Sequence, residues 1–180
     1  MTATQMFYAH MMSIAVATSM VLACWRSRLA GRLFFVLLFL WASQVNLRMA
    51  LTNPGVYLEY APLALLQTYR DFIRGFFAVH ITAIVATIAL GQLAIAVLVA
   101  GSGRSVQVGL TGAIVFLVAI APLGVGAGFP TTLIMAWAAG VLLTSTYPVS
   151  LPSDLRAWWR GRAGRRPRTH STHRAGRHAA

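Results

Sequence analysis

The sequence has very few acidic residues and no lysine. Only three of its 180 residues are Asp or Glu, and charged residues make up 10%, whereas a soluble domain carries roughly a quarter. Apolar residues make up 58% of the chain. Water is therefore not the main solvent of this chain, and the lipid bilayer is the natural alternative.

Cysteine is also scarce. The single cysteine, Cys24, excludes an intramolecular disulfide and any zinc or iron–sulfur site built from the cysteines of one chain. The histidines near the C-terminus have no carboxylate or cysteine beside them, so we predict no metal site. We also predict no catalytic residues.

Long apolar runs dominate the first 148 residues. A membrane-spanning helix needs about 20 mostly apolar residues, and the short alternating segments of a transmembrane barrel are absent. We therefore predict an all-α, polytopic transmembrane helix bundle over residues 1–148, a four-helix core plus an N-terminal span. The predicted spans are residues 6–24, 33–51, 75–100, 106–125 and 129–147.

Two further segments are expected outside the hydrocarbon. Residues 56–73 carry apolar and aromatic residues at helical spacing, which predicts an amphipathic segment lying in the interface. Residues 149–180 are rich in Arg, Gly, His and Pro, which predicts a disordered basic tail that attracts anionic lipid headgroups. Trp158 and Trp159 are candidate interfacial anchors. No specific nucleic-acid binding is expected, because nothing in the tail indicates a folded domain that would recognise a nucleic-acid sequence.

The arginines predict the orientation. With the N-terminus outside, the cytoplasmic side receives twelve of the fifteen arginines, eight of them in the tail, and the outer side keeps Arg48, Arg70 and Arg74. The first apolar run has no basic residue before it, so we interpret it as a retained helix and not a secretory signal. We expect a multi-pass protein of the inner (plasma) membrane, N-out and C-in.

Several polar residues stand in or beside the second and third predicted spans. Ionisable groups at membrane depth are candidate binding sites by default. One interpretation is a site for a small anion or lipid headgroup, built on the outer arginines. The other is that the arginines extend to headgroups, Asp71 neutralises a neighbouring arginine and Gln92 makes an interhelical hydrogen bond. The candidates are Gln44, Arg48, Arg70, Asp71, Arg74, His80 and Gln92.

Two histidines are predicted at similar depth. By the helical rise of about 1.5 Å per residue, His10 lies about 6 Å and His80 about 9 Å below the outer surface. Such a pair can ligate a haem iron, or one imidazole can accept a proton from a quinol. The alternative is a hydrogen bond from each histidine to a neighbouring helix. Haem and quinone remain the alternatives to a protein without a cofactor.

Residues 32–143, about six-tenths of the chain, contain a pattern known from one family. The segment Ile88–Leu98, read IALGQLAIAVL, is followed by the glycine-rich turn Gly101–Arg104 and another apolar helix. This arrangement resembles the DoxX-like family of small bacterial four-helix membrane proteins. Gln92 stands where the family commonly has glutamate, and the N-terminal span is additional.

The resemblance implies an accessory role, because DoxX-like proteins are associated with membrane oxidoreductase complexes, often as accessory subunits. We therefore expect an integral membrane module of accessory or structural type, which is not an enzyme on its own. Its expected partners are a membrane oxidoreductase subunit or further copies of the chain. The alternatives are the anion- or lipid-binding transport protein and the haem or quinol electron carrier described above.

Overall fold

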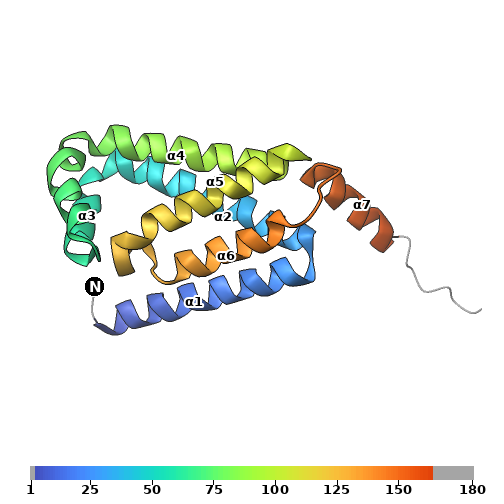
Figure 1. Cartoon of the computed structure of the whole chain (residues 1–180), viewed down its shortest axis with the longest axis horizontal. Helices are drawn as coiled ribbons and strands as arrows, with labels where there is room; N and C mark the ends of the chain where they lie inside the picture. The colour runs from blue at the N-terminus through green and yellow to red at the C-terminus, as the bar shows by residue number, and fades with distance from the viewer. Residues whose placement is uncertain (1–2, 164–180) are drawn as a thin grey trace, which may run out of the picture.

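A computed structural model describes residues 3–163, with side chains described for Tyr8 and residues 11–162. This part of the chain is helical and contains no strand, which confirms the all-α prediction. Its long helices run back and forth along one axis (Figure 1). They are α1 (Ala3–Arg26), α2 (Arg28–Thr52), α4 (Ala78–Ala100), α5 (Arg104–Ile120) and α6 (Thr131–Leu143).

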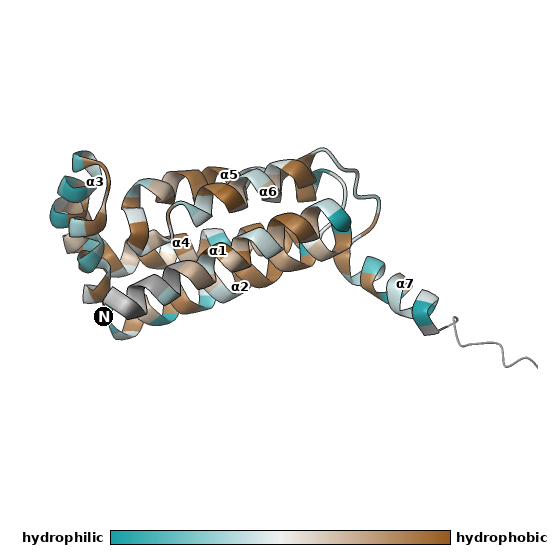
Figure 2. Ribbon diagram, turned by 90° about the horizontal axis from the view of Figure 1, so that it is seen from below, coloured by the Kyte–Doolittle hydropathy of each residue, from teal (hydrophilic) through white to brown (hydrophobic). Residues whose placement is uncertain are grey.

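Three helical stretches are long and apolar enough to cross a membrane: Arg28–Thr52, Gln67–Ala100 and Arg104–Ala127. Met11–Arg26 and Thr131–Leu143 are shorter apolar helices. Large apolar side chains cover the outside of the long helices, with Val79 78% exposed and Leu90 64% exposed. An apolar surface of this extent indicates a membrane protein. Hydrophilic residues gather at the two ends (Figure 2).

One end of the bundle, which we call the cap end, is closed by short helices. They are η1 (Pro54–Leu63), α3 (Gln67–Phe72), η2 (Ile73–Phe77) and η3 (Ala121–Ala127). The segment over 56–73, predicted to be amphipathic, consists of a 3₁₀ helix followed by a short α-helix. Pro62 lies inside this segment, where proline lacks the N–H that a continuous α-helix needs. The amide of Leu65 donates to the carbonyl of Pro122 at 2.8 Å, which ties this segment to η3.

The opposite end, which we call the arginine end, holds the α1–α2 junction, the turn at 101–103 and residues 144–163. The prediction of a disordered tail from residue 149 is wrong for its first part, because Leu151–Ala163 forms helix α7. Pro152 suits the first turn of a helix, and the carboxylate of Asp154 stabilises the helix N-terminus. Leu151 is buried, and α7 contacts α2 and α4. Residues 164–180 of the predicted tail lie outside the described residues.

The interior contains two apolar clusters. The larger one, towards the arginine end, includes Phe35, Phe39, Val99 and Leu110. The smaller one, at the cap end, packs residues such as Phe77 with the buried face of η1. Helix α2 packs most extensively against α4, and α5 packs against α4 and α6. Helix α6 ends at Leu143, before the predicted limit at 147, because hydroxyl side chains and a proline follow it.

Candidate functional site

The most extensively bonded polar side chain in the described part of the chain is that of Arg32, near the start of α2. It is completely buried. Its Nε donates to the carbonyl of Val99 at 3.3 Å, and its Nη2 donates to the carbonyls of Val99, Ala100 and Gly101, the last at 2.6 Å. These carbonyls end helix α4, where a cation is favourable because the last C=O groups lack intrahelical partners.

The remaining nitrogen of Arg32 binds the segment after α6. Its Nη1 donates to the carbonyl of Val149 at 3.3 Å and to Oδ2 of Asp154 at 3.0 Å. The guanidinium carbon lies 4.9 Å from the centroid of the Tyr147 ring, which adds a cation–π contact. Arg32 therefore joins α2, the end of α4, the 147–149 connection and α7. We call these residues the Arg32 junction.

The sequence alone indicates Arg32 only as part of the cytoplasmic arginine excess, and Asp154 falls within the tail predicted to be disordered. One signal was available. Leu151-Pro152-Ser153-Asp154 combines an early proline with an acidic residue in the first turn, which is typical of a helix start. No sequence pattern indicates which carbonyls Arg32 would meet, because that depends on how α2 and α4 pack.

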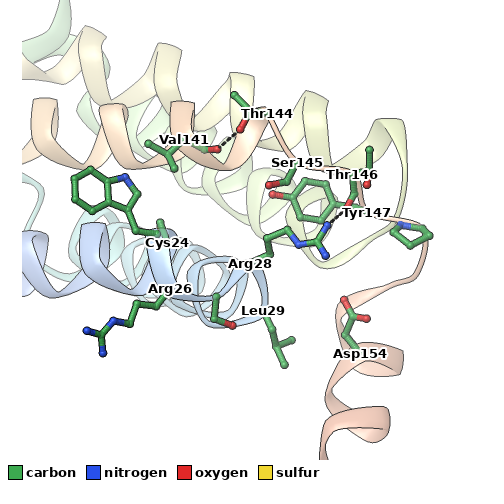
Figure 3. Close-up of a pocket in the computed structure, with 13 residues that line it drawn as sticks. Cys24, Arg26, Arg28, Leu29, Val141, Thr144, Ser145, Thr146, Tyr147 and Asp154 are labelled. Carbon is green, nitrogen blue, oxygen red and sulfur yellow. Dashed lines mark hydrogen bonds between the residues drawn. The ribbon is translucent and has the colours of Figure 1, made fainter.

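A cleft of about 650 Å³ lies beside the Arg32 junction, between the α1–α2 junction and the α6–α7 connection (Figure 3). The side chain of Arg28 reaches across it, and its Nη1 donates to the carbonyl of Thr146 at 3.1 Å. One part of the lining is polar and the other is aromatic and aliphatic. The lining residues are Cys24, Trp25, Arg26, Ser27, Arg28, Leu29, Val141, Thr144, Ser145, Thr146, Tyr147, Pro148 and Asp154.

Between the two apolar clusters, polar side chains of α2, α4 and η1 pair with one another. The hydroxyl of Tyr57 donates to Oδ1 of Asn46 at 2.9 Å, and Nδ2 of Asn46 donates to Oε1 of the buried Gln92 at 2.9 Å. Burial raises the pKa of the Tyr57 hydroxyl, which keeps it protonated as a donor. The interhelical hydrogen bond predicted for Gln92 is confirmed. These bonded groups tie the helices together.

The other predicted ligand residues take no part in these hydrogen bonds of Tyr57, Asn46 and Gln92. Gln44 and Arg48 are exposed on the outside of α2. Arg70 is half-buried, and its Nε donates to the carbonyl of Ala64 at 2.9 Å. Arg74 is exposed.

Asp71 does not pair with a neighbouring arginine. Its Oδ1 accepts from Nε2 of Gln67 at 2.7 Å, and the ion pair found among residues 3–163 is that of Arg32 with Asp154. No hydrogen bond or ion pair connects the outer arginines, Asp71 and His80 within the described residues. The cleft at the arginine end includes none of them.

The two histidines considered for haem are on separate helices. His80 is exposed, its Nδ1 lies 3.0 Å from the carbonyl oxygen of Phe76, and its ring stacks on Phe76 with centroids 4.5 Å apart. The side chain of His10 lies outside the described residues. Helices α1 and α4 lie on opposite sides of the bundle, with α5 and α6 between them in Figure 1. The described residues contain no group of three His, Cys, Asp or Glu side chains that could hold a metal ion.

Comparisons with protein-family models, curated proteins and solved structures find no match for this chain. The function of this protein is therefore inferred from its fold and from the geometry of its side chains.

Proposed function

We propose that this protein is a non-enzymatic accessory module of a membrane complex, a five-span protein of the inner (plasma) membrane with its N-terminus outside. The distribution of arginine supports the orientation, because the arginine end holds Arg26, Arg28, Arg32 and Arg104, and the chain continues from there into the basic tail. Cytoplasmic loops carry such an excess. Helix α6 is about 20 Å long at 1.5 Å per residue, and it packs against α1 and α5 in the bundle.

The observation that carries the accessory role is a polar side chain on the lipid side of α2. Gln44 is exposed, and its amide has no hydrogen-bond partner among the described residues. It stands eight residues before the end of α2 at Thr52, which places it about 12 Å below that end by the helical rise. An amide at this depth in hydrocarbon favours a partner helix that supplies the missing hydrogen bonds.

The residues around Gln44 form a continuous stripe. Its members are spaced alternately by four and three residues, which is the spacing that packs one helix against another. Leu37, Trp41 and Leu51 in this stripe are 57%, 64% and 68% exposed. By contrast, the exposed hydroxyls of Thr18 and Thr87 donate to carbonyls of their own helices. The stripe consists of Leu37, Trp41, Gln44, Arg48 and Leu51.

We propose that the α2 stripe binds a transmembrane helix of a partner protein. The resemblance to DoxX-like proteins suggests a membrane oxidoreductase as that partner. The outer arginines support transport less well, because no hydrogen bond or ion pair joins them within the described residues. Electron transfer through the histidine pair is also less well supported, because α1 and α4, which carry His10 and His80, lie on opposite sides of the bundle.

The test is purification from the native membrane in mild detergent, followed by mass spectrometry of the co-eluting proteins. We expect a stoichiometric partner with the wild-type protein and its loss in Gln44→Leu. Gln107→Leu is the matched control, because Gln107 is an exposed amide near the start of α5, where it reaches the interface. Equal recovery of the partner with both variants would contradict the proposal. A second copy as the sole co-eluting protein would assign the stripe to a homo-oligomer.

A further inference from the structure

We propose that the cleft at the arginine end binds the phosphate group of an anionic phospholipid. The proposal concerns a site separate from the α2 stripe and from the tail. It rests on the charge of the cleft, on its free hydrogen-bond donors and on the apolar wall that continues onto the outer surface of the bundle.

The cleft has an excess of positive charge. Arg26 and Arg28 line it, and its one carboxylate, Asp154, is paired with Arg32 at 3.0 Å. Arg28 is the principal candidate contact, since its side chain reaches across the cleft while that of Arg26 points away from it (Figure 3). Arg28 uses one N–H for the carbonyl of Thr146, and its remaining donors can bind phosphate oxygens.

Hydroxyl groups add donors beside Arg28. The side-chain oxygen of Ser27 accepts from the amide of Ala30 at 3.2 Å, which leaves its O–H able to donate. The hydroxyl of Thr146 has no partner among the described residues. The hydroxyl of Thr144 is already used, because it donates to the carbonyl of Val141. Arg28, Ser27 and Thr146 therefore provide a set of donors suited to an anion.

The apolar wall indicates that the phosphate belongs to a lipid. Trp25, Leu29 and Val141 line the cleft. Trp25, which is 62% exposed, packs edge-to-face against Trp137 with ring centroids 5.5 Å apart, and Trp137 is 53% exposed. Tryptophan is enriched where headgroups meet hydrocarbon, so a headgroup in the cleft places the acyl chains along this wall. The volume of the cleft lies in the range of small-molecule sites, roughly 300–1,000 Å³.

Native mass spectrometry of the full-length protein in mild detergent tests the proposal. The probes are dioleoyl phosphatidylglycerol, the zwitterionic dioleoyl phosphatidylcholine, and glycerol 3-phosphate as a soluble phosphate. We expect the protein to bind phosphatidylglycerol more tightly than phosphatidylcholine. Arg28→Gln should weaken phosphatidylglycerol binding about tenfold or more, since it removes a charge-assisted hydrogen bond. Arg160→Gln, on α7 outside the cleft, is the matched control and should bind as the wild type does.

Two further variants distinguish binding of a lipid from binding of a free phosphate. They also test the site without replacing Arg28, so the proposal can still be judged if Arg28→Gln does not fold. Trp25→Ala keeps Arg28 and the hydroxyl groups of Ser27 and Thr146, and it should weaken binding of phosphatidylglycerol but not of glycerol 3-phosphate. Thr146→Val keeps the backbone carbonyl that Arg28 contacts and should weaken binding of both. Equal phosphatidylglycerol affinity of Arg28→Gln and Arg160→Gln would overturn the site. Displacement of phosphatidylglycerol by an equal concentration of glycerol 3-phosphate would overturn the assignment to a lipid.

Discussion

The charge of the Arg32 guanidinium can be buried because each of its nitrogens donates a hydrogen bond to an oxygen. Most of these oxygens belong to backbone carbonyls. A buried charge without such partners would be very costly. The contacts lie on segments that are 67 to 122 residues away in the sequence. One side chain therefore holds the ends of several helices together.

Replacing Arg32 should strongly destabilise the protein. Arg32→Leu leaves the carbonyls at the end of α4 and the carboxylate of Asp154 without their donor, and breaking a buried charge pair in this way costs about 3–5 kcal/mol. Asp154→Asn should cost about 1 kcal/mol or less, because Asp154 is 36% exposed and solvent screens its charge. Thermal unfolding in detergent, followed by circular dichroism, measures both. Equal melting temperatures for the two variants would contradict the central position of Arg32.

The pair of amides between α2 and α4 predicts a smaller, coupled effect. Asn46→Ala and Gln92→Ala each remove one side of the 2.9 Å hydrogen bond. Interhelical hydrogen bonds of this kind contribute about 0.6 kcal/mol in membrane proteins. A double-mutant cycle in the free energy of unfolding should therefore show a coupling near that size. Strictly additive effects would mean that the two amides do not stabilise the fold through this bond.

At the scale of the helix, the α4–α5 crossing depends on a small residue. Gly109 on α5 is buried, and a Cβ there would lie 2.9 Å from Cβ of Leu98 and from the backbone nitrogen of Val99. Backbone atoms cannot move aside as a flexible side chain can. The close approach of the two helices therefore requires glycine at this position.

Gly109→Ala should lower the melting temperature, because α5 must move away from α4 to admit the methyl group. Gly91→Ala on α4 is the matched control, since a Cβ at Gly91 meets nothing within 4 Å. That change should be neutral or stabilising by up to about 1 kcal/mol, the difference in helix propensity between the residues. Comparison of the two unfolding curves in one detergent decides the matter, and similar destabilisation by both changes would contradict the close crossing.

The helices were predictable where the local sequence determines them. Thr52-Asn53-Pro54-Gly55 ends α2, and Gly101 to Arg104 separates α4 from α5. Both boundaries are predictable because proline and glycine determine the local backbone conformation independently of tertiary contacts. Helix α7 was missed because its arginines and glycine resemble a disordered composition. Its place depends on Leu151 and Asp154 meeting the bundle, which is a tertiary property.

The candidate sites were predictable to a smaller extent. A polar residue inside an apolar run indicates either an interhelical bond or a ligand, and Gln92 proved to be the former. The four-residue spacing of Gln44 and Arg48 places them on one face of α2, but the spacing does not show whether that face is turned inward. The Arg32 junction and the cleft beside it combine four separate segments, so they become visible only in the assembled bundle.

At the scale of the whole molecule, the two ends of the bundle differ in chemistry. The cap end is folded from short helices and contains Arg70 and Arg74, while the arginine end holds the Arg32 junction, the cleft and α7. The α2 stripe lies between them on the outer surface. The proposals for the stripe and for the cleft both require that these two ends face opposite sides of one membrane.

The most direct test of this account is cysteine accessibility in intact cells that express the protein. In a Cys24→Ser background, Asn53→Cys at the cap end should react with a membrane-impermeant maleimide added outside. Ser102→Cys, in the turn between α4 and α5 at the arginine end, should react only after the cells are permeabilised. The reverse pattern would contradict the orientation, and equal labelling of both positions in intact cells would contradict the membrane-spanning arrangement.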